Sequence, residues 1–216
     1  MPEAWYPVWL NLSGQLCLVV GGGQVAYRKV QGLLACGARV RVAGPELAPE
    51  LNSLADQGKI AATYQPYSSN DLEGVLLAIA ATDNQEVNQR VSREALSRGI
   101  LVNIVDQPQA GNFIVPSVVR CGDLVFGIST GGQSPFLARL IRQELEQLYG
   151  PEVRKLLLRL TQLRQQLKAK VATSQERQKI WEQLLDLELL SWARQGQWEN
   201  VEERIRSAVP LSGPEP

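Results

Sequence analysis

The chain has 216 residues with 22 acidic and 22 basic side chains, so its formal net charge is zero. This balance gives no bulk electrostatic attraction to nucleic acid or to an anionic membrane, and we expect neither as a partner. The N-terminus lacks the basic start and apolar core of a signal peptide, and no apolar run reaches membrane-span length. Three cysteines, far apart in the chain, favour reduced thiols in the cytoplasm over disulfides.

The sequence contains no histidine. Any proton transfer near neutral pH must therefore use another side chain, and a metal site would need carboxylates or thiolates. No cluster of those residues has the spacing of metal ligands, so we expect no metal site.

A strand, a glycine-rich turn and a helix follow one another near the N-terminus. Residues 16–20 form an apolar run, and Gly-Gly-Gly-Gln-Val-Ala at 21–26 fits the dinucleotide-binding pattern G-x-G-x-x-G/A. Gly21 would permit a tight turn, Gly23 would let the backbone approach a pyrophosphate, and Ala26 would let the helix pack closely on the strand. The anion would lie at the helix N-terminus.

Strands and helices then alternate up to residue 112. We expect further strands at 38–43, 60–64, 75–81 and 100–105 and helices at 25–36 and 49–57, with a third helix capped by Thr82 or Asp83 and ended by Gly99. This alternation predicts an α/β fold with a Rossmann-type parallel sheet covered on both faces. Its ligand should lie beyond the carboxyl ends of the strands.

The pattern changes after residue 112. Residues 113–119 and 123–129 predict two strands, and Ser134 is a good N-cap for a helix that begins at Pro135. Beyond Gly150 we expect helices at 153–171, 174–194 and 200–208. The sequence thus divides into a Rossmann domain at 1–112, a small α+β region at 113–150 and a C-terminal helical region at 151–216.

The end of the second strand lacks the acidic residue that usually binds the ribose 2′-hydroxyl. Pro45 and Glu46 follow Gly44 there, with no Arg or Lys for a 2′-phosphate, which favours NAD over NADP. Glu46 either reaches the ribose or is a first-turn carboxylate favoured by the helix dipole, and the sequence leaves both readings open.

Asp106 is a lone carboxylate on the ligand side of the strand at 100–105. In a chain without histidine it is the first candidate for a general base. The alternative is that it only forms the turn before Gln107-Pro108.

The loop at 130–134 is a candidate second anion site, built from backbone N–H groups and hydroxyls at a helix start. The nearby Arg120, Arg139 and Arg142 favour an anion. The alternative is a plain turn with a helix cap.

Four segments together resemble precorrin-2 dehydrogenase, the dehydrogenase module of siroheme synthase. They are Gly-Gly-Gly-Gln-Val-Ala at 21–26 with Arg28-Lys29, Asn-Ile-Val-Asp at 103–106, Asn-Phe-Ile-Val-Pro-Ser at 112–117, and Ser-Thr-Gly-Gly-Gln-Ser-Pro at 129–135. The resemblance covers residues 5–150 and implies an oxidoreductase that uses NAD to convert precorrin-2 to sirohydrochlorin. It also implies a homodimer whose interface and substrate region is 113–150.

The resemblance places the family's catalytic aspartate at Asp106. The predicted cofactor-binding residues are Gly21, Gly22, Gly23, Gln24, Val25, Pro45, Glu46 and Thr82. The predicted substrate-binding residues are Asn112, Thr130, Gly131 and Ser134. Two alternatives remain open: a bifunctional enzyme that also inserts Fe²⁺ into sirohydrochlorin, as some family members do, and an NAD-sensing module without catalysis.

Overall fold

The computed structural model describes residues 5–209. Contacts within the chain divide it into two compact units, with the division between Val115 and Pro116.

The first unit is built on a five-stranded parallel sheet in the order β3-β2-β1-β4-β5. The strands are β1 (Leu16–Val20), β2 (Arg39–Ala43), β3 (Ala61–Thr63), β4 (Leu77–Ala80) and β5 (Leu101–Ile104). The helices are α1 (Gln24–Leu34), α2 (Pro49–Asp56) and α3 (Gln85–Ser97), with short 3-10 helices η1 (Ser69–Leu72) and η2 (Pro108–Ala110). The predicted Rossmann-type sheet is confirmed.

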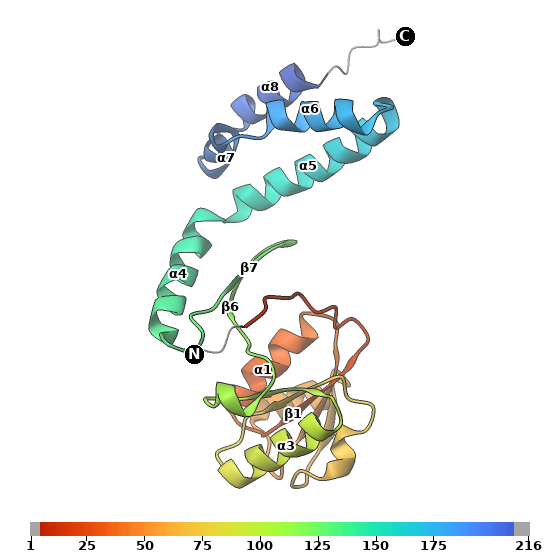
Figure 1. The fold of residues 1–216 in the computed structure, drawn as a ribbon, viewed down its shortest axis with the longest axis vertical. Helices are drawn as coiled ribbons and strands as arrows, with labels where there is room; N and C mark the ends of the chain where they lie inside the picture. The colour runs from red at the N-terminus through yellow and green to blue at the C-terminus, as the bar shows by residue number, and fades with distance from the viewer. Residues whose placement is uncertain (1–4, 210–216) are drawn as a thin grey trace. The chain divides into compact units, whose positions relative to one another are not determined.

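Strand β1 contributes to both cores of this unit because successive side chains of a strand point to opposite faces. Cys17 and Val19 pack with α1 and α2 on one face. Leu18 and Val20 pack with α3 on the other. In Figure 1, α1 and α3 lie on opposite sides of β1.

The strand order creates a switch point beside β1. The chain runs outward from β1 to β2 and β3, and then returns to place β4 on the other side of β1. In open parallel sheets, ligands bind outside the carboxyl ends of the two strands at such a point.

In its described part, residues 116–209, the second unit joins a β-hairpin to five helices. Its elements are β6 (Ser117–Cys121), β7 (Leu124–Ile128), α4 (Pro135–Leu148), α5 (Pro151–Lys170), α6 (Ser174–Leu184), α7 (Leu187–Arg194) and α8 (Trp198–Ala208). Helix α4 packs on the hairpin. The later helices share a core that includes Leu163, Leu184 and Ile205.

Two predicted elements differ from the structure. The helix predicted at 174–194 is two helices, because Leu185 is extended and the Asp186 carboxylate caps α7 by accepting from the Leu189 N–H at 2.8 Å. The strand predicted at 113–119 begins only at Ser117. Phe113 instead packs against the core of the first unit, and its carbonyl accepts a hydrogen bond from Asn103 at 3.1 Å.

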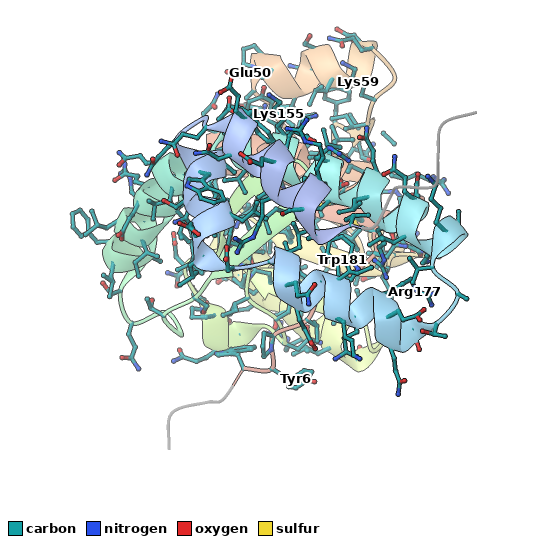
Figure 2. The ribbon with its side chains drawn as sticks, turned by 90° about the horizontal axis from the view of Figure 1, so that it is seen from above. Tyr6, Glu50, Lys59, Lys155, Arg177 and Trp181 are labelled. Carbon is teal, nitrogen blue, oxygen red and sulfur yellow. The ribbon has the colours of Figure 1, made fainter. Side chains whose placement is uncertain are left out.

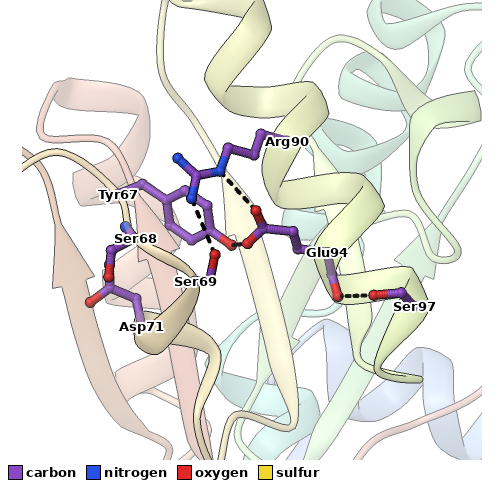
Figure 3. Close-up of polar contacts among 7 residues, drawn as sticks. All are labelled: Tyr67, Ser68, Ser69, Asp71, Arg90, Glu94 and Ser97. Carbon is purple, nitrogen blue, oxygen red and sulfur yellow. Dashed lines mark hydrogen bonds and ion pairs between the residues drawn. The ribbon is translucent and has the colours of Figure 1, made fainter.

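A polar network fastens η1 to α3 (Figure 3). The Glu94 carboxylate accepts from the Tyr67 hydroxyl at 2.8 Å and from Arg90 Nε at 2.7 Å, and Arg90 also donates to Ser69 at 3.1 Å. Burial raises the pKa of Glu94, but hydrogen bonds from Arg90, Tyr67 and Ser69 outweigh burial and lower this pKa to about 2.

Replacing Glu94 with Gln should destabilise the protein by about 1 kcal/mol at pH 7, since the Arg90 charge loses its partner at a partly exposed site. The folded pKa lies below the ordinary value of 4.5, so this stabilisation is present above pH 4.5 and is lost as the pH falls toward 2. Urea unfolding at several pH values should show the difference from wild type shrinking on acidification. Exposed Glu73→Gln is the control, and a pH-independent difference would contradict the network's role.

Candidate active site

The turn after β1 brings three loops together, backbone against backbone. Gly21 has a φ of 126°, and a Cβ there would lie 2.3 Å from the Ala81 carbonyl oxygen. A Cβ on Gly22 would lie 1.7 Å from the Glu46 carbonyl oxygen. Only glycine fits at these two positions, so the loops after β1, β2 and β4 meet because the turn carries no side chain.

Gly23 faces open space, since a Cβ there would meet nothing within 4 Å. It is the N-cap of α1, which has neither a capping side chain nor an acidic residue in its first turn. Every other α-helix in residues 5–209 has one or the other. Because the first N–H groups of a helix need acceptors and its dipole favours negative charge, this end of α1 suits a phosphate.

The side chains at the start of α1 are hydrogen-bonded or buried, so the main chain is the part of this helix end that can contact a ligand. Gln24 donates through its amide to the Glu50 carboxylate at 2.9 Å, and this hydrogen bond lowers the pKa of Glu50. Glu50 is labelled in Figure 2. Val25 is half-buried, and Ala26 is fully buried against the sheet. A nucleotide at this turn would therefore meet backbone N–H groups.

The loop after β2 is held against the glycine turn. The Ala48 N–H donates to the Gly22 carbonyl at 2.8 Å, and the Gly21 N–H donates to the Ala43 carbonyl at 2.8 Å. Pro45 and Glu46 are exposed in this loop. The structure thus places these two residues beside the glycine turn.

Thr82 lies at the carboxyl end of β4, where its hydroxyl donates to the Asn88 side-chain oxygen at 2.8 Å. The cap of α3 is Asn84, whose side-chain oxygen accepts from the N–H groups of Glu86 at 2.9 Å and Val87 at 3.2 Å. The prediction of Thr82 or Asp83 as the cap is wrong, because Asn84 is the residue whose side chain reaches the second and third N–H groups.

Asp106 follows β5 in a left-handed conformation with a φ of 62°. It is the one non-glycine residue with positive φ in the described part of the chain. Such conformations cost energy in L residues and concentrate at functional sites. The Asp106 side chain is exposed at the ligand edge of the sheet.

Amide and hydroxyl groups hold the loop that carries Asp106. Asn112 accepts from the Val102 N–H at 2.7 Å and donates to the Ile100 carbonyl at 3.2 Å, so it pairs with the free edge of β5. Ser92 donates to the Ala110 carbonyl in the same loop. The Asn112 amide therefore supports the loop, and its predicted contact with substrate stays a prediction.

Lys29 is a half-buried cation on α1 that is not among the predicted site residues. It lies three residues after Ala26 and four before Leu33, both buried, so it shares the side of α1 that packs on the sheet. Burial lowers the pKa of its amine, the charge of Arg28 lowers it further, and the charge of Asp106 opposes both.

The loop with Thr130, Gly131 and Ser134 belongs to the second unit. Ser134 accepts from the Leu137 N–H at 3.2 Å, so it caps α4, and the Thr130 hydroxyl accepts from the Ser134 N–H at 3.0 Å. Gly131 has a φ of 62°. Since both hydroxyls take part in the loop's own hydrogen bonds, substrate binding by these residues stays a prediction.

No group of three or more His, Cys, Asp or Glu side chains that could hold a metal ion occurs in residues 5–209. Within the same range, no helix has both the length and the apolar character needed to cross a membrane.

Comparison with known proteins identifies the family. Residues 8–117, slightly more than half of the chain, match a family model described as putative NAD(P)-binding. The chain belongs to this family. Residues 126–148 match the model for the central region of a sirohaem biosynthesis protein, and residues 154–209 match that for the dimerisation region of sirohaem synthase. These matches confirm the resemblance to the siroheme synthase module found in the sequence motifs.

Several relatives are much longer. Siroheme synthase of Nitrosococcus oceani is 38% identical over 205 residues, which are 95% of this chain and 44% of the relative. Siroheme synthase of Chromobacterium violaceum is 41% identical over 182 residues, 84% of this chain and 39% of the relative. This chain thus spans less than half the length of these relatives.

A solved structure described as SirC, precorrin-2 dehydrogenase, has a TM-score of 0.76 and 26% sequence identity to this chain. The match covers 92% of this chain and 100% of that one. The match includes parts of both units. The family model described as a dimerisation region covers residues 154–209, which lie outside the predicted dimer interface at 113–150.

Gly22→Ala should destabilise the fold by about 2 kcal/mol or more, because the new methyl group collides with the Glu46 carbonyl and must push the two loops apart. The control is Gly32→Ala, at an exposed position inside α1 where a Cβ meets nothing within 4 Å. That variant should gain up to about 1 kcal/mol from helix propensity. Thermal unfolding followed by circular dichroism measures both, and equal midpoints for the two variants would contradict the close approach.

Proposed function

We propose that this chain is an NAD-dependent oxidoreductase that converts precorrin-2 to sirohydrochlorin on the route to siroheme. The observation that carries the proposal is the match to SirC, precorrin-2 dehydrogenase, along the full length of that chain. The identity of 38% to 42% to several siroheme synthases supports the same pathway.

The glycine turn fits a dinucleotide, because the N-terminus of α1 faces open space at Gly23 and carries no cap or carboxylate of its own. The main chain of residues 21–25 would hold the pyrophosphate, Pro45 and Glu46 would contact the ribose, and Thr82 would line the neighbouring loop. The absence of Arg and Lys from residues 44–50 favours NAD over NADP. When bound, NAD⁺ accepts the hydride that the substrate loses.

Oxidation of precorrin-2 also releases a proton, and Asp106 is the proposed acceptor, directly or through water. Its carboxylate is exposed at the carboxyl end of β5, as proton transfer from a bound ligand requires. The hydrogen bonds of Asn112 and Ser92 fix the loop, so the carboxylate would be positioned before the substrate arrives.

The remaining assignments are part of the same proposal. Thr130, Gly131 and Ser134 would meet substrate carboxylates through the N–H-rich loop before α4. The active form would be a homodimer, formed through residues 154–209 as well as the region at 113–150. The cytoplasmic location is part of this proposal, because Cys17, Cys36 and Cys121 form no disulfide.

Gly23→Asp should abolish NAD binding without unfolding the protein, because the side chain enters open space and its charge repels the pyrophosphate. Isothermal titration with NAD measures the loss, and Gly23→Asn, of similar size but neutral, should bind more tightly than the Asp variant. Unchanged affinity in the Asp variant would mean that the nucleotide binds elsewhere.

Asp106→Asn should keep NAD binding and lower turnover by a factor on the order of 10² to 10⁴, because Asn tolerates the left-handed backbone but cannot accept the proton. The assay follows NADH formation with enzymatically made precorrin-2. Exposed Asp56→Asn, at the end of α2, is the control. Full activity of the Asp106 variant would remove this residue from the role of base, and no NADH from wild type would overturn the proposed function.

A further inference from the structure

Three polar side chains are buried in the part of the chain that the structure describes, and all three lie in the first unit. They are Asn88 and Ser92 of α3 and Asn103 of β5, with 5%, 6% and 7% of their surface exposed. Each bonds to the main chain of a segment that follows β4 or β5. Because a buried polar group is costly unless it is paired, these side chains hold loops rather than fill the core.

Asn88 holds the loop after β4. Its side-chain oxygen accepts from the Thr82 hydroxyl at 2.8 Å, and its amide donates to the Thr82 carbonyl at 2.8 Å. Thr82 follows Ala81, whose carbonyl oxygen lies so close to Gly21 that a Cβ there would be 2.3 Å away. The Asn88 side chain thus fixes the loop against which the glycine turn packs, on the side proposed for the nucleotide.

Ser92 holds the loop after β5 from the same helix. Its hydroxyl donates to the Ala110 carbonyl. Ala110 ends the short helix η2, and its N–H donates to the Gln107 carbonyl at 3.0 Å. Gln107 directly follows Asp106. The Ser92 bond therefore anchors the turn that carries the candidate base.

Asn88 and Ser92 lie on one side of α3, four residues apart, which is about 6 Å along the helix axis at 1.5 Å per residue. Val91 and Ala95 of the same helix are buried in the core shared with the sheet, so α3 is itself firmly packed. One helix thus carries the attachment points of both loops, and neither attaching residue is among the predicted site residues.

We propose that Asn88 and Ser92 are positioning residues that make α3 the common support of the loop after β4 and the Asp106 loop. This inference rests on the proposed function, in which the first loop lines the NAD site and Asp106 accepts the proton. The reaction needs the hydride acceptor and the base at a fixed separation, and a misplacement of about 1 Å lowers rates strongly. The two bonds to α3 set the separation of the loops before any ligand binds.

The test compares Asn88→Ala, Ser92→Ala and the double variant with two controls on α3. Gln89→Ala removes an exposed side chain, and Ser97→Ala removes a hydroxyl whose bond stays within the helix, to the Glu94 carbonyl at 2.8 Å (Figure 3). Thermal unfolding gives the midpoint of each variant, and the assays run well below the lowest midpoint, so that lost stability alone does not alter the kinetic constants. Ser92→Cys, with a weak donor of similar size, adds a milder change.

The measurements are isothermal titration with NAD and NADH formation from enzymatically made precorrin-2. We expect Asn88→Ala to weaken the NAD affinity about fivefold or more. Ser92→Ala should lower kcat about tenfold and leave the NAD affinity within about twofold of wild type. Ser92→Cys should fall between wild type and Ser92→Ala, and both controls should match wild type.

The double variant tests the common support directly. Its kcat/KM for NAD should fall by less than the product of the two single losses, because one loose loop already removes the fixed separation. A loss equal to that product would mean that the two loops are held independently, and it would overturn the inference.

Unchanged kcat in Ser92→Ala, or unchanged NAD affinity in Asn88→Ala, would also overturn the inference. Wild-type protein that forms no NADH would overturn the proposed function itself, together with this inference. Active wild type with both single variants silent would reject only the role of α3.

Discussion

The close approach of backbone to backbone at the glycine turn is the constraint on which the rest of the first unit depends. The Gly21 and Gly22 positions leave no room for a Cβ against the carbonyl oxygens of Ala81 and Glu46. Three loops can meet there only because the turn has no side chains. The same turn leaves the N-terminus of α1 uncapped at Gly23 and facing open space. One local feature thus brings the three loops together and leaves free N–H groups that suit an anion.

The opposite side of the site depends on polar groups that the fold itself uses. Asn112 takes the place of a neighbouring strand at the edge of β5, and Asn103 and Ser92 tie the adjoining segments to it. These bonds satisfy buried backbone groups that would otherwise be costly, and they fix the chain on both sides of Asp106. The Asn112 amide and the candidate base Asp106 are thus parts of one loop.

Prediction from sequence failed where short-range side-chain bonds decide the outcome. The apolar spacing of residues 174–194 suits one helix, yet the Asp186 carboxylate offers the backbone a competing hydrogen bond and starts a new helix. Asn84 likewise displaces its neighbours Thr82 and Asp83 as the cap of α3. Residues 82, 83 and 84 all have side chains that can cap a helix, and the geometry of the turn selects Asn84 among them.

The sequence alone determined the parallel sheet, the glycine turn, the family and the prominence of Asp106, because alternating apolar runs and a glycine pattern reflect local rules of period and steric fit. Tertiary structure decided what those residues are free to do. It tied the Asn112 amide to a strand edge and engaged the hydroxyls of Thr82 and Ser134 in local bonds. Such assignments depend on which atoms from distant segments meet, and that information is absent from the order of residues along the chain.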